Sequence, residues 1–559
     1  MVHKYVWAEI GKLDSSIVNV VLEELIRAAT DGGIGSRRCE IIARTAAGLA
    51  SVNVRGKIFV KLRKVLGKTS LKPSKTLPDN IHWNEIATLT RFALVASNHS
   101  KQFAYDQLYF PDICHVITLI AGTGQILVRK SVYGVIMNYL QSLLLTKGDD
   151  ASGPRLRGLV DELMTVEKLQ LFGLTRQSLT SDYYNYDPPN DKTTIDSYEA
   201  LALLLVRIME ITSGSRGKSV ILICDILSYA LSALLNVWRA RWMSLATSTA
   251  FQLPAAIQCR AFLVLGTLAT SDVDDDLVYQ MLVAFKTALA QSTETETVNV
   301  VCMLRCICKI VPSLVRGSSY LPQLFWLGVA LLQSSYPAFY AEAADLLRIT
   351  VETLEKHGAF EEETIPTVLL GGRAPLEDTI SQLDRLLCIS FESSFSFSLA
   401  AIIFKGVRHS HLKSSAEMVL RSLFAVTVRS SSPATTLCED ALGYFIALVP
   451  FATTRDSYVK LLQECRAEEL VKSAAALREN DSREVESLEV AADDFTLRAP
   501  ISVNAALLAV TFATAILTTA QGDDSETEML YNLLLDIGSV HPNFSFMMYA
   551  CILFSAFCC

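Results

Sequence analysis

The chain has 559 residues, of which 51% are hydrophobic and only 19% are charged. This balance excludes a chain that is disordered over most of its length, because disordered segments combine low hydrophobicity with high net charge. The formal net charge of -8 also argues against nucleic acid as a general partner.

Amphipathic helical patterns begin near the N-terminus and recur along the chain. Residues 15–29 place apolar side chains three or four positions apart, which predicts a helix with one buried face. That face is predicted to comprise Ile17, Val20, Val21, Leu25 and Ala28. Similar patterns predict helices over residues 39–52, 83–97, 132–145, 197–211, 274–292, 339–357 and 454–471.

The predicted helices come in pairs with a loose spacing of about 40 residues, which is the period of HEAT and armadillo repeats. No segment alternates strands with helices, so a parallel sheet is not expected. The sequence therefore predicts an all-α fold, an α-solenoid of HEAT/armadillo-like helical hairpins.

Two segments interrupt the helical pattern. Residues 179–196 are expected to form an exposed loop, and residues 476–499 an exposed acidic linker, because residues 479–494 hold seven acidic residues against one arginine. The expected organisation is a solenoid over residues 1–178, its continuation over 197–475 with an unusual apolar insertion at 217–236, and truncated terminal helices over 500–559.

Two short motifs look like phosphate-binding loops but lack a required glycine. VLGKTS at residues 65–70 is preceded by Leu62, where such a loop needs its first glycine. DGGIGSRR at residues 31–38 has Arg38 at the third glycine position of a dinucleotide-binding turn. We instead expect one helix to end at these glycines and Ser36 to cap the next. No cofactor is predicted.

A basic run occupies residues 55–75, with eight basic residues and no acidic one. The candidate partner-binding patch consists of Lys57, Lys61, Arg63, Lys64 and Lys68. Such a patch suits an acidic protein, anionic lipid or nucleic acid. The alternative is a solvated helix face followed by a loop.

The 13 cysteines are scattered singly and follow no secretory signal, which indicates reduced thiols in a cytosolic or nuclear protein. The closest group, Cys302, Cys306 and Cys308, lies in an apolar stretch without histidine. Zinc usually takes four ligands in two spaced pairs, so we expect core packing here and no metal site. No catalytic motif is present either.

Two apolar segments, residues 219–238 and 499–520, approach the length of a membrane span. Asp225 interrupts the first segment, and Pro500 and Asn504 interrupt the second. We expect buried helices of a large helical protein, with a polytopic membrane protein as the alternative.

The stretch FESSFSFSLAAIIFKGVRHSH, residues 391–411, alternates serine and phenylalanine as an exposed strand would. Two apolar stripes at helical spacing instead predict one helix with a wide buried face. Ser414 and Glu417 have the spacing of a capping box and should open the next helix. His409 and His411 are then expected to face solvent in the intervening turn. The stripes are Phe391, Phe395, Leu399 and Ile402, and Phe397, Ala401 and Phe404.

This stretch closely resembles a segment in the C-terminal region of neurofibromin and its fungal Ira-type relatives. The resemblance extends over most of the chain and is interrupted by residues 217–236. Other similar segments are VWAEIG, GGIGSRRCEIIARTAAGLAS, TLPDNIHWNEIATLTRFAL, LPAAIQCRAFLVLGTLA, YLPQLFWLGVALLQ and LLAVTFATAILTTA.

The resemblance implies a very large negative regulator of Ras. In that family a central domain accelerates GTP hydrolysis through an arginine finger, and a CRAL-TRIO-like and pleckstrin-like lipid-binding module follows it. This chain resembles the HEAT-like arm after that module and has no match to the GTPase-activating domain or its finger.

The implied role is a non-catalytic scaffold and dimerisation arm of a cytoplasmic protein, peripheral at membranes at most. Its partners would be proteins, including a second copy through the parent protein and Ras through the absent domain. A HEAT/armadillo adaptor unrelated to Ras is the alternative.

Overall fold

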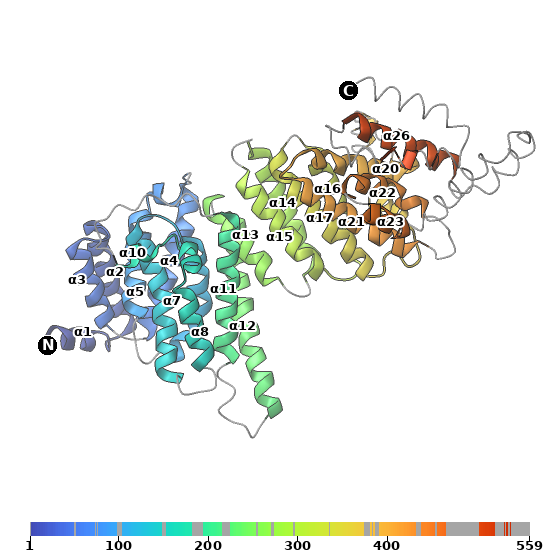
Figure 1. Cartoon of the computed structure of the whole chain (residues 1–559). Coiled ribbons are helices and arrows are strands. Elements are labelled where there is room, and N and C mark those ends of the chain that lie inside the picture. The colour runs from blue at the N-terminus through green and yellow to red at the C-terminus, as the bar shows by residue number, and fades with distance from the viewer. Residues whose placement is uncertain are drawn as a thin grey trace, which may run out of the picture. The chain divides into compact units, whose positions relative to one another are not determined.

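A computed structural model shows that the chain is helical, with one isolated bridge between Val273 and Leu314 in the described part (Figure 1). The all-α prediction is confirmed. The structure describes residues 2–49, 52–72, 74, 76–97, 103–147, 153–180, 194–214, 224–252, 255–269, 273–293, 297–334, 336–373, 381–382, 384–385, 391–431, 438–452, 455–464, 502–519, 530–531, 533–534 and 537.

The chain divides into two compact units, and one of the three points at which it passes between them lies inside a helix. Unit 1 comprises residues 1–271 and 280–310, and unit 2 comprises residues 272–279 and 311–559. The boundary between residues 279 and 280 falls within α14 (Asp275–Gln291). The loop and linker expected at residues 179–196 and 476–499 lie largely or wholly outside the described residues, so those boundaries stay predictions.

Unit 1 is built from helices that pack against their neighbours in space, such as α4 on α5 and α6, and α13 on α12 and α15. Its helices are α1 (Val2–Ile10), α2 (Ser15–Gly32), α3 (Arg37–Gly48), α4 (Val52–Lys68), η1 (Thr69–Leu71), η2 (Leu77–Asp79), α5 (Trp83–Ser97), α6 (Phe103–Ile120), α7 (Ile126–Lys147), α8 (Gly153–Leu163), α9 (Val166–Leu171), α10 (Arg176–Thr180), α11 (Ile195–Gly214), α12 (Cys224–Gln252), α13 (Ala255–Leu268), α15 (Val298–Ile310) and part of α14.

Unit 2 repeats this manner of packing, with α16 on α17, α17 on α21 and α20 on α22. Its described helices are η3 (Val311–Ser313), α16 (Tyr320–Leu332), η4 (Pro337–Phe339), α17 (Tyr340–Lys356), α18 (Ile365–Gly371), α20 (Phe391–Phe404), η6 (Lys405–Arg408), α21 (Lys413–Ser430), η7 (Glu439–Ala441), α22 (Leu442–Leu448), η8 (Val449–Phe451), α23 (Arg455–Glu464) and α26 (Val503–Thr519). A helix is therefore present in every region where the apolar spacing predicts one.

The core of unit 1 contains a buried arginine that holds the end of a helix. Arg260 on α13 is 8% exposed, and its Nη1 donates to the carbonyl oxygens of Leu119 and Ala121 at 3.1 and 2.7 Å. These carbonyls end α6, where the last turn of a helix has no partners of its own. The Arg260 guanidinium also lies 4.0 Å from the ring centroid of Tyr198 on α11. One side chain thus ties α13 to both α6 and α11.

The N-terminal helices confirm the predicted turn and correct the predicted buried face. Gly33 has φ 73 at the end of α2, and Ser36 Oγ accepts a hydrogen bond from Cys39 N at the start of α3. The apolar face predicted for α2 is wrong, because Ile17 and Val20 are 49% and 65% exposed. The buried side chains are Val18, Leu22, Ile26 and Ala29, a stripe of the same spacing displaced by about one position.

The phenylalanine-serine stretch forms one helix, as predicted, although the backbone of α20 leaves helical geometry at Ser394 (φ -152, ψ 51). The first predicted stripe is buried throughout, whereas Ala401 of the second stripe is exposed. The predicted capping box is wrong. α21 begins at Lys413, its N-cap residue Leu412 makes no side-chain cap, and Glu417 pairs instead with Arg421.

Neither apolar segment yields a bilayer-crossing helix within the described residues. The described part of the second segment is α26, in which Ala506, Ala509 and Ala513 are fully buried, so the prediction of a buried helix is confirmed there. In the first segment the side chains of residues 219–233 lie outside the described residues, and Trp238 is buried.

Candidate functional site

The candidate basic patch lies on α4, and four of its five members share one side of that helix. At about 100° per residue, Lys57, Lys61, Lys64 and Lys68 fall within about 60° of one another. Lys64 and Lys68 are exposed, and the other two are half-buried. Lys61 Nζ lies 3.5 Å from Glu23 Oε1 on α2, so part of its charge is balanced.

Arg63, the fifth residue of the patch, faces a different part of unit 1. Its Nη1 lies 3.7 Å from Oδ1 of Asp112 on α6, whose side chain is only 2% exposed. Arg241 on α12 approaches the other oxygen of the same carboxylate at 3.5 Å. A buried carboxylate needs such compensation, so Arg63 balances an internal charge, and the exposed members of the patch are Lys64 and Lys68.

His115 lies one turn after Asp112 and is fully buried. Its Nε2 lies 2.9 Å from Thr249 Oγ1, and its Nδ1 has no hydrogen-bond partner among the described residues. Burial, together with the positive charge of Arg63, lowers the pKa of His115 to about 3. The imidazole is therefore neutral near pH 7, which suits a structural role in the α4–α6–α12 core.

The cysteine group packs in the core of unit 1, as predicted. Cys302, Cys306 and Cys308 on α15 are at most 7% exposed, and Cys302 packs with Cys259 and Leu263 on α13. Burial raises the pKa of the Cys306 thiol well above its usual range, which keeps that thiol protonated and unreactive. In the part of the chain that the structure describes, no three His, Cys, Asp or Glu side chains gather as metal ligands would.

The remaining motifs occupy places consistent with structural roles. Leu62 is a fully buried residue within α4, so residues 65–68 continue a helix and do not form the turn of a phosphate-binding loop. His409 and His411 are exposed in the turn between η6 and α21, as predicted, with ring centroids 6.0 Å apart.

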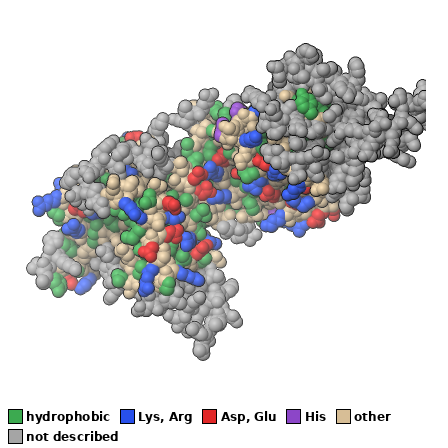
Figure 2. Space-filling model, viewed as in Figure 1, with side chains coloured by type: hydrophobic (Ala, Val, Ile, Leu, Met, Phe, Trp, Pro, Cys, Tyr) green, Lys and Arg blue, Asp and Glu red, His purple; other side chains and the backbone are tan. Residues whose placement is uncertain are grey.

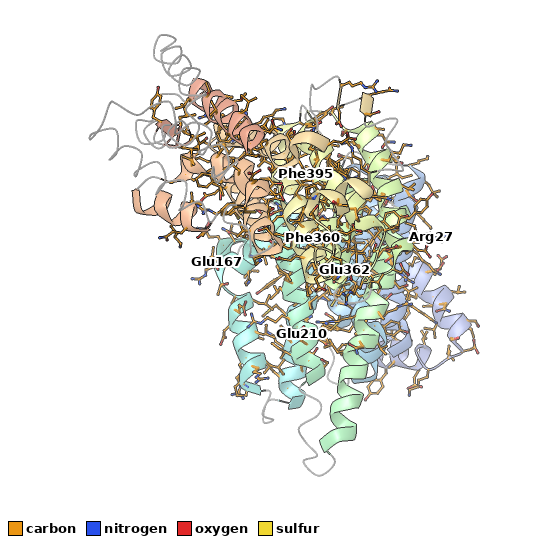
Figure 3. The ribbon with its side chains drawn as sticks, turned by 90° about the vertical axis from the view of Figure 1, so that its right-hand side faces the viewer. Arg27, Glu167, Glu210, Phe360, Glu362 and Phe395 are labelled. Carbon is orange, nitrogen blue, oxygen red and sulfur yellow. The ribbon has the colours of Figure 1, made fainter. Side chains whose placement is uncertain are left out.

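Unit 2 holds a small cavity of about 190 Å³ beside the kink in α20. Phe395, which lies among the helices of this unit in Figure 3, lines it together with Phe397 and Tyr444. At its edge Glu439 accepts hydrogen bonds from the backbone N and the Oγ of Ser502, at 2.7 and 2.9 Å. This carboxylate thereby satisfies the start of α26, which explains its position without a ligand.

Charge elsewhere on the molecule is mixed. On the face seen in Figure 2, basic and acidic side chains are intermingled over both units. Charged side chains also form ion pairs between helices, for example Arg429 with Glu355 at 2.7 Å in unit 2 and Arg207 with Glu162 at 2.8 Å in unit 1. The lysine row on α4 therefore remains the candidate surface that the sequence singled out.

No protein-family model matches the chain. The inhibitory regulator protein IRA2 of Saccharomyces cerevisiae is 21% identical over 439 residues, which cover 75% of this chain and 13% of IRA2. The inhibitory regulator protein IRA1 of the same yeast is 20% identical over 446 residues, which cover 78% of this chain and 14% of IRA1. The chain thus spans a small part of the length of these relatives. These similarities support the interpretation of the chain as Ira/neurofibromin-like.

Proposed function

We propose that this chain serves as a non-catalytic helical arm of a Ras-regulating protein of the Ira/neurofibromin type. In this role it scaffolds the GTPase-activating domain of the parent protein and contributes to homodimerisation. The parent protein acts in the cytoplasm and has at most a peripheral association with membranes.

The observation that carries this proposal is the extent of the similarity to IRA2, over 75% of the chain, in a fold of stacked helices. Stacked helical hairpins offer long surfaces for other domains and subunits. In unit 1 the buried Asp112 carboxylate lies beside Arg63, and the buried His115 ring bonds to Thr249 through one nitrogen, contacts that agree with a supporting role. Similarity to two inhibitory regulators makes an unrelated adaptor the weaker explanation.

The first test measures GTP hydrolysis by Ras in the presence of the purified chain. An arginine finger accelerates this reaction by roughly 10³–10⁵-fold, so a chain without one should change the rate by less than about twofold. A Ras GTPase-activating domain assayed in parallel provides the positive control. Acceleration by the chain alone that approaches this control would contradict the proposal.

The dimerisation part of the proposal needs a separate measurement. Light scattering of the purified chain, whose protomer mass is 61.5 kDa, should give about twice that mass at micromolar concentration. If the measured mass equals that of one protomer at every concentration up to about 100 μM, the proposed contribution of this arm to dimerisation is wrong.

A further inference from the structure

The loop that follows α4, residues 69–82, holds two large aliphatic side chains out in solvent. Leu71 is 79% exposed and Ile81 is 65% exposed. Exposed aliphatic residues are common singly, but two on one loop next to a row of lysines are a feature that needs an explanation.

A buried asparagine links the described parts of this loop. Asn80 is 5% exposed, and its Nδ2 donates to the carbonyl oxygen of Lys72 at 2.7 Å and, more weakly, to Ser74 Oγ at 3.3 Å. Its Oδ1 accepts from the backbone N of His82 at 3.1 Å. These bonds link the segment that contains Leu71 to the segment that contains Ile81. Both side chains are therefore held at the same end of α4 by contacts among the described residues of the loop, 69–72, 74 and 76–82.

The lysine row of α4 leads directly into this loop. Lys64 and Lys68 are exposed on the last two turns of the helix, and Lys72 is exposed one residue beyond Leu71. Within the described part of the chain none of these three lysines forms an ion pair. The single acidic residue of the loop is Asp79, which accepts a hydrogen bond from Thr76 Oγ1 at 2.5 Å.

We propose that the end of α4 and the loop 69–82 dock onto an anionic lipid bilayer. Leu71 and Ile81 enter the boundary between headgroups and acyl chains, while Lys64, Lys68 and Lys72 contact acidic headgroups. This inference goes beyond the scaffold role and does not depend on it.

The kind of basic residue and the shape of the loop favour a bilayer over an acidic protein. Protein–protein interfaces are depleted in lysine and enriched in arginine, and the exposed cations here are all lysines. Leu71 and Ile81 project outward from the surface, which suits insertion into a soft, continuous apolar layer. Arg63, the arginine of the basic run closest to them, pairs with Asp112 inside unit 1.

The test is co-sedimentation of the 559-residue chain with vesicles of phosphatidylcholine alone and of phosphatidylcholine with phosphatidylserine. We expect binding to the anionic vesicles that weakens as salt is raised, because exposed charges are screened. Leu71→Ser combined with Ile81→Ser should lower the partition coefficient by about tenfold or more. Lys64→Ala combined with Lys68→Ala should lower it by a similar factor.

The matched control combines Leu145→Ser on α7 with Lys286→Ala on α14. It changes an 84% exposed leucine and an exposed lysine outside the loop, and should bind as the unaltered chain does. Circular dichroism should show unchanged helix content in all three variants. Absence of binding to anionic vesicles would overturn the proposal. So would binding that the lysine variant loses but the Leu71 and Ile81 variant retains, since the loop would then not enter the bilayer.

Discussion

At the scale of single residues, buried polar side chains of unit 1 connect helices through ion pairs and hydrogen bonds. Asp112 is held between Arg63 and Arg241, and Arg260 caps the end of α6. In a low-dielectric interior these charges are tolerated because each has opposite charge or carbonyl oxygens near it. His115 avoids the cost of burying a charge, because its lowered pKa keeps the imidazole neutral near pH 7.

His115 makes folding stability depend on pH in a predictable direction. Its pKa is about 3 in the folded chain against 6.5 in the unfolded chain, so between these values the unfolded state binds more protons. Stability contributed by the neutral imidazole is present above pH 6.5 and is lost as the pH falls toward 3. When the pH is lowered from 7.5 to 5.5, the free energy of unfolding of the chain should fall by about 1.4 kcal/mol more than that of a His115→Gln variant. Urea unfolding at both pH values measures this, and equal losses in the two proteins would contradict it.

At the scale of helices, close packing depends on positions where no side chain intervenes. Gly443 on α22 lies against the backbone of α20, where an added Cβ would come within 2.7 Å of Phe397 N. Such a contact involves backbone atoms, which cannot rotate away as a flexible side chain can. This part of α20 directly follows the kink at Ser394 and packs on α22, and the glycine allows the close approach.

Replacing Gly443 by alanine should therefore separate α20 from α22 and lower stability by about 1–3 kcal/mol. Gly158 on α8 offers the matched control, because nothing lies within 4 Å of its added Cβ. Gly158→Ala should be neutral or stabilise by up to about 1 kcal/mol, since alanine is the better helix former. Thermal unfolding followed by circular dichroism compares the two, and equal effects would refute the packing argument.

At the scale of the whole molecule, the chain forms two compact units that share α14. Each unit has its own set of fully buried aromatic residues, including Trp242 and Phe262 in unit 1 and Phe325 and Tyr444 in unit 2. Units with separate cores are expected to unfold as separate cooperative blocks.

Calorimetry should accordingly resolve two unfolding transitions. Arg260→Ala removes the bonds that cap α6 and should lower the transition of unit 1 by about 5 °C or more. Gly443→Ala should lower only the transition of unit 2. Arg260→Lys keeps the positive charge but loses the planar guanidinium group. Its unit 1 transition temperature should lie between those of the unaltered chain and the alanine variant. A single transition moved by both substitutions would show that the units unfold together.

The sequence by itself determined the all-α class and the positions of the helices with the clearest apolar spacing, because that spacing acts between residues only a few positions apart. Ser36 and the glycines before it illustrate this, since their partners are within the same turn. The sequence also located the basic run, because lysines four positions apart on a helix must share a side.

Only the tertiary structure decided which helix faces are buried and which charges remain at the surface. On α2 two apolar stripes have the same period, and packing against α3 and α5 selected the one containing Leu22. Arg63 does not contribute to the surface patch because it pairs with Asp112, which lies on another helix. Arg260 likewise bonds to Ala121, which lies 139 positions away in the sequence. Such pairings depend on how helices pack in space, and a local sequence pattern does not identify a partner that is distant in the sequence.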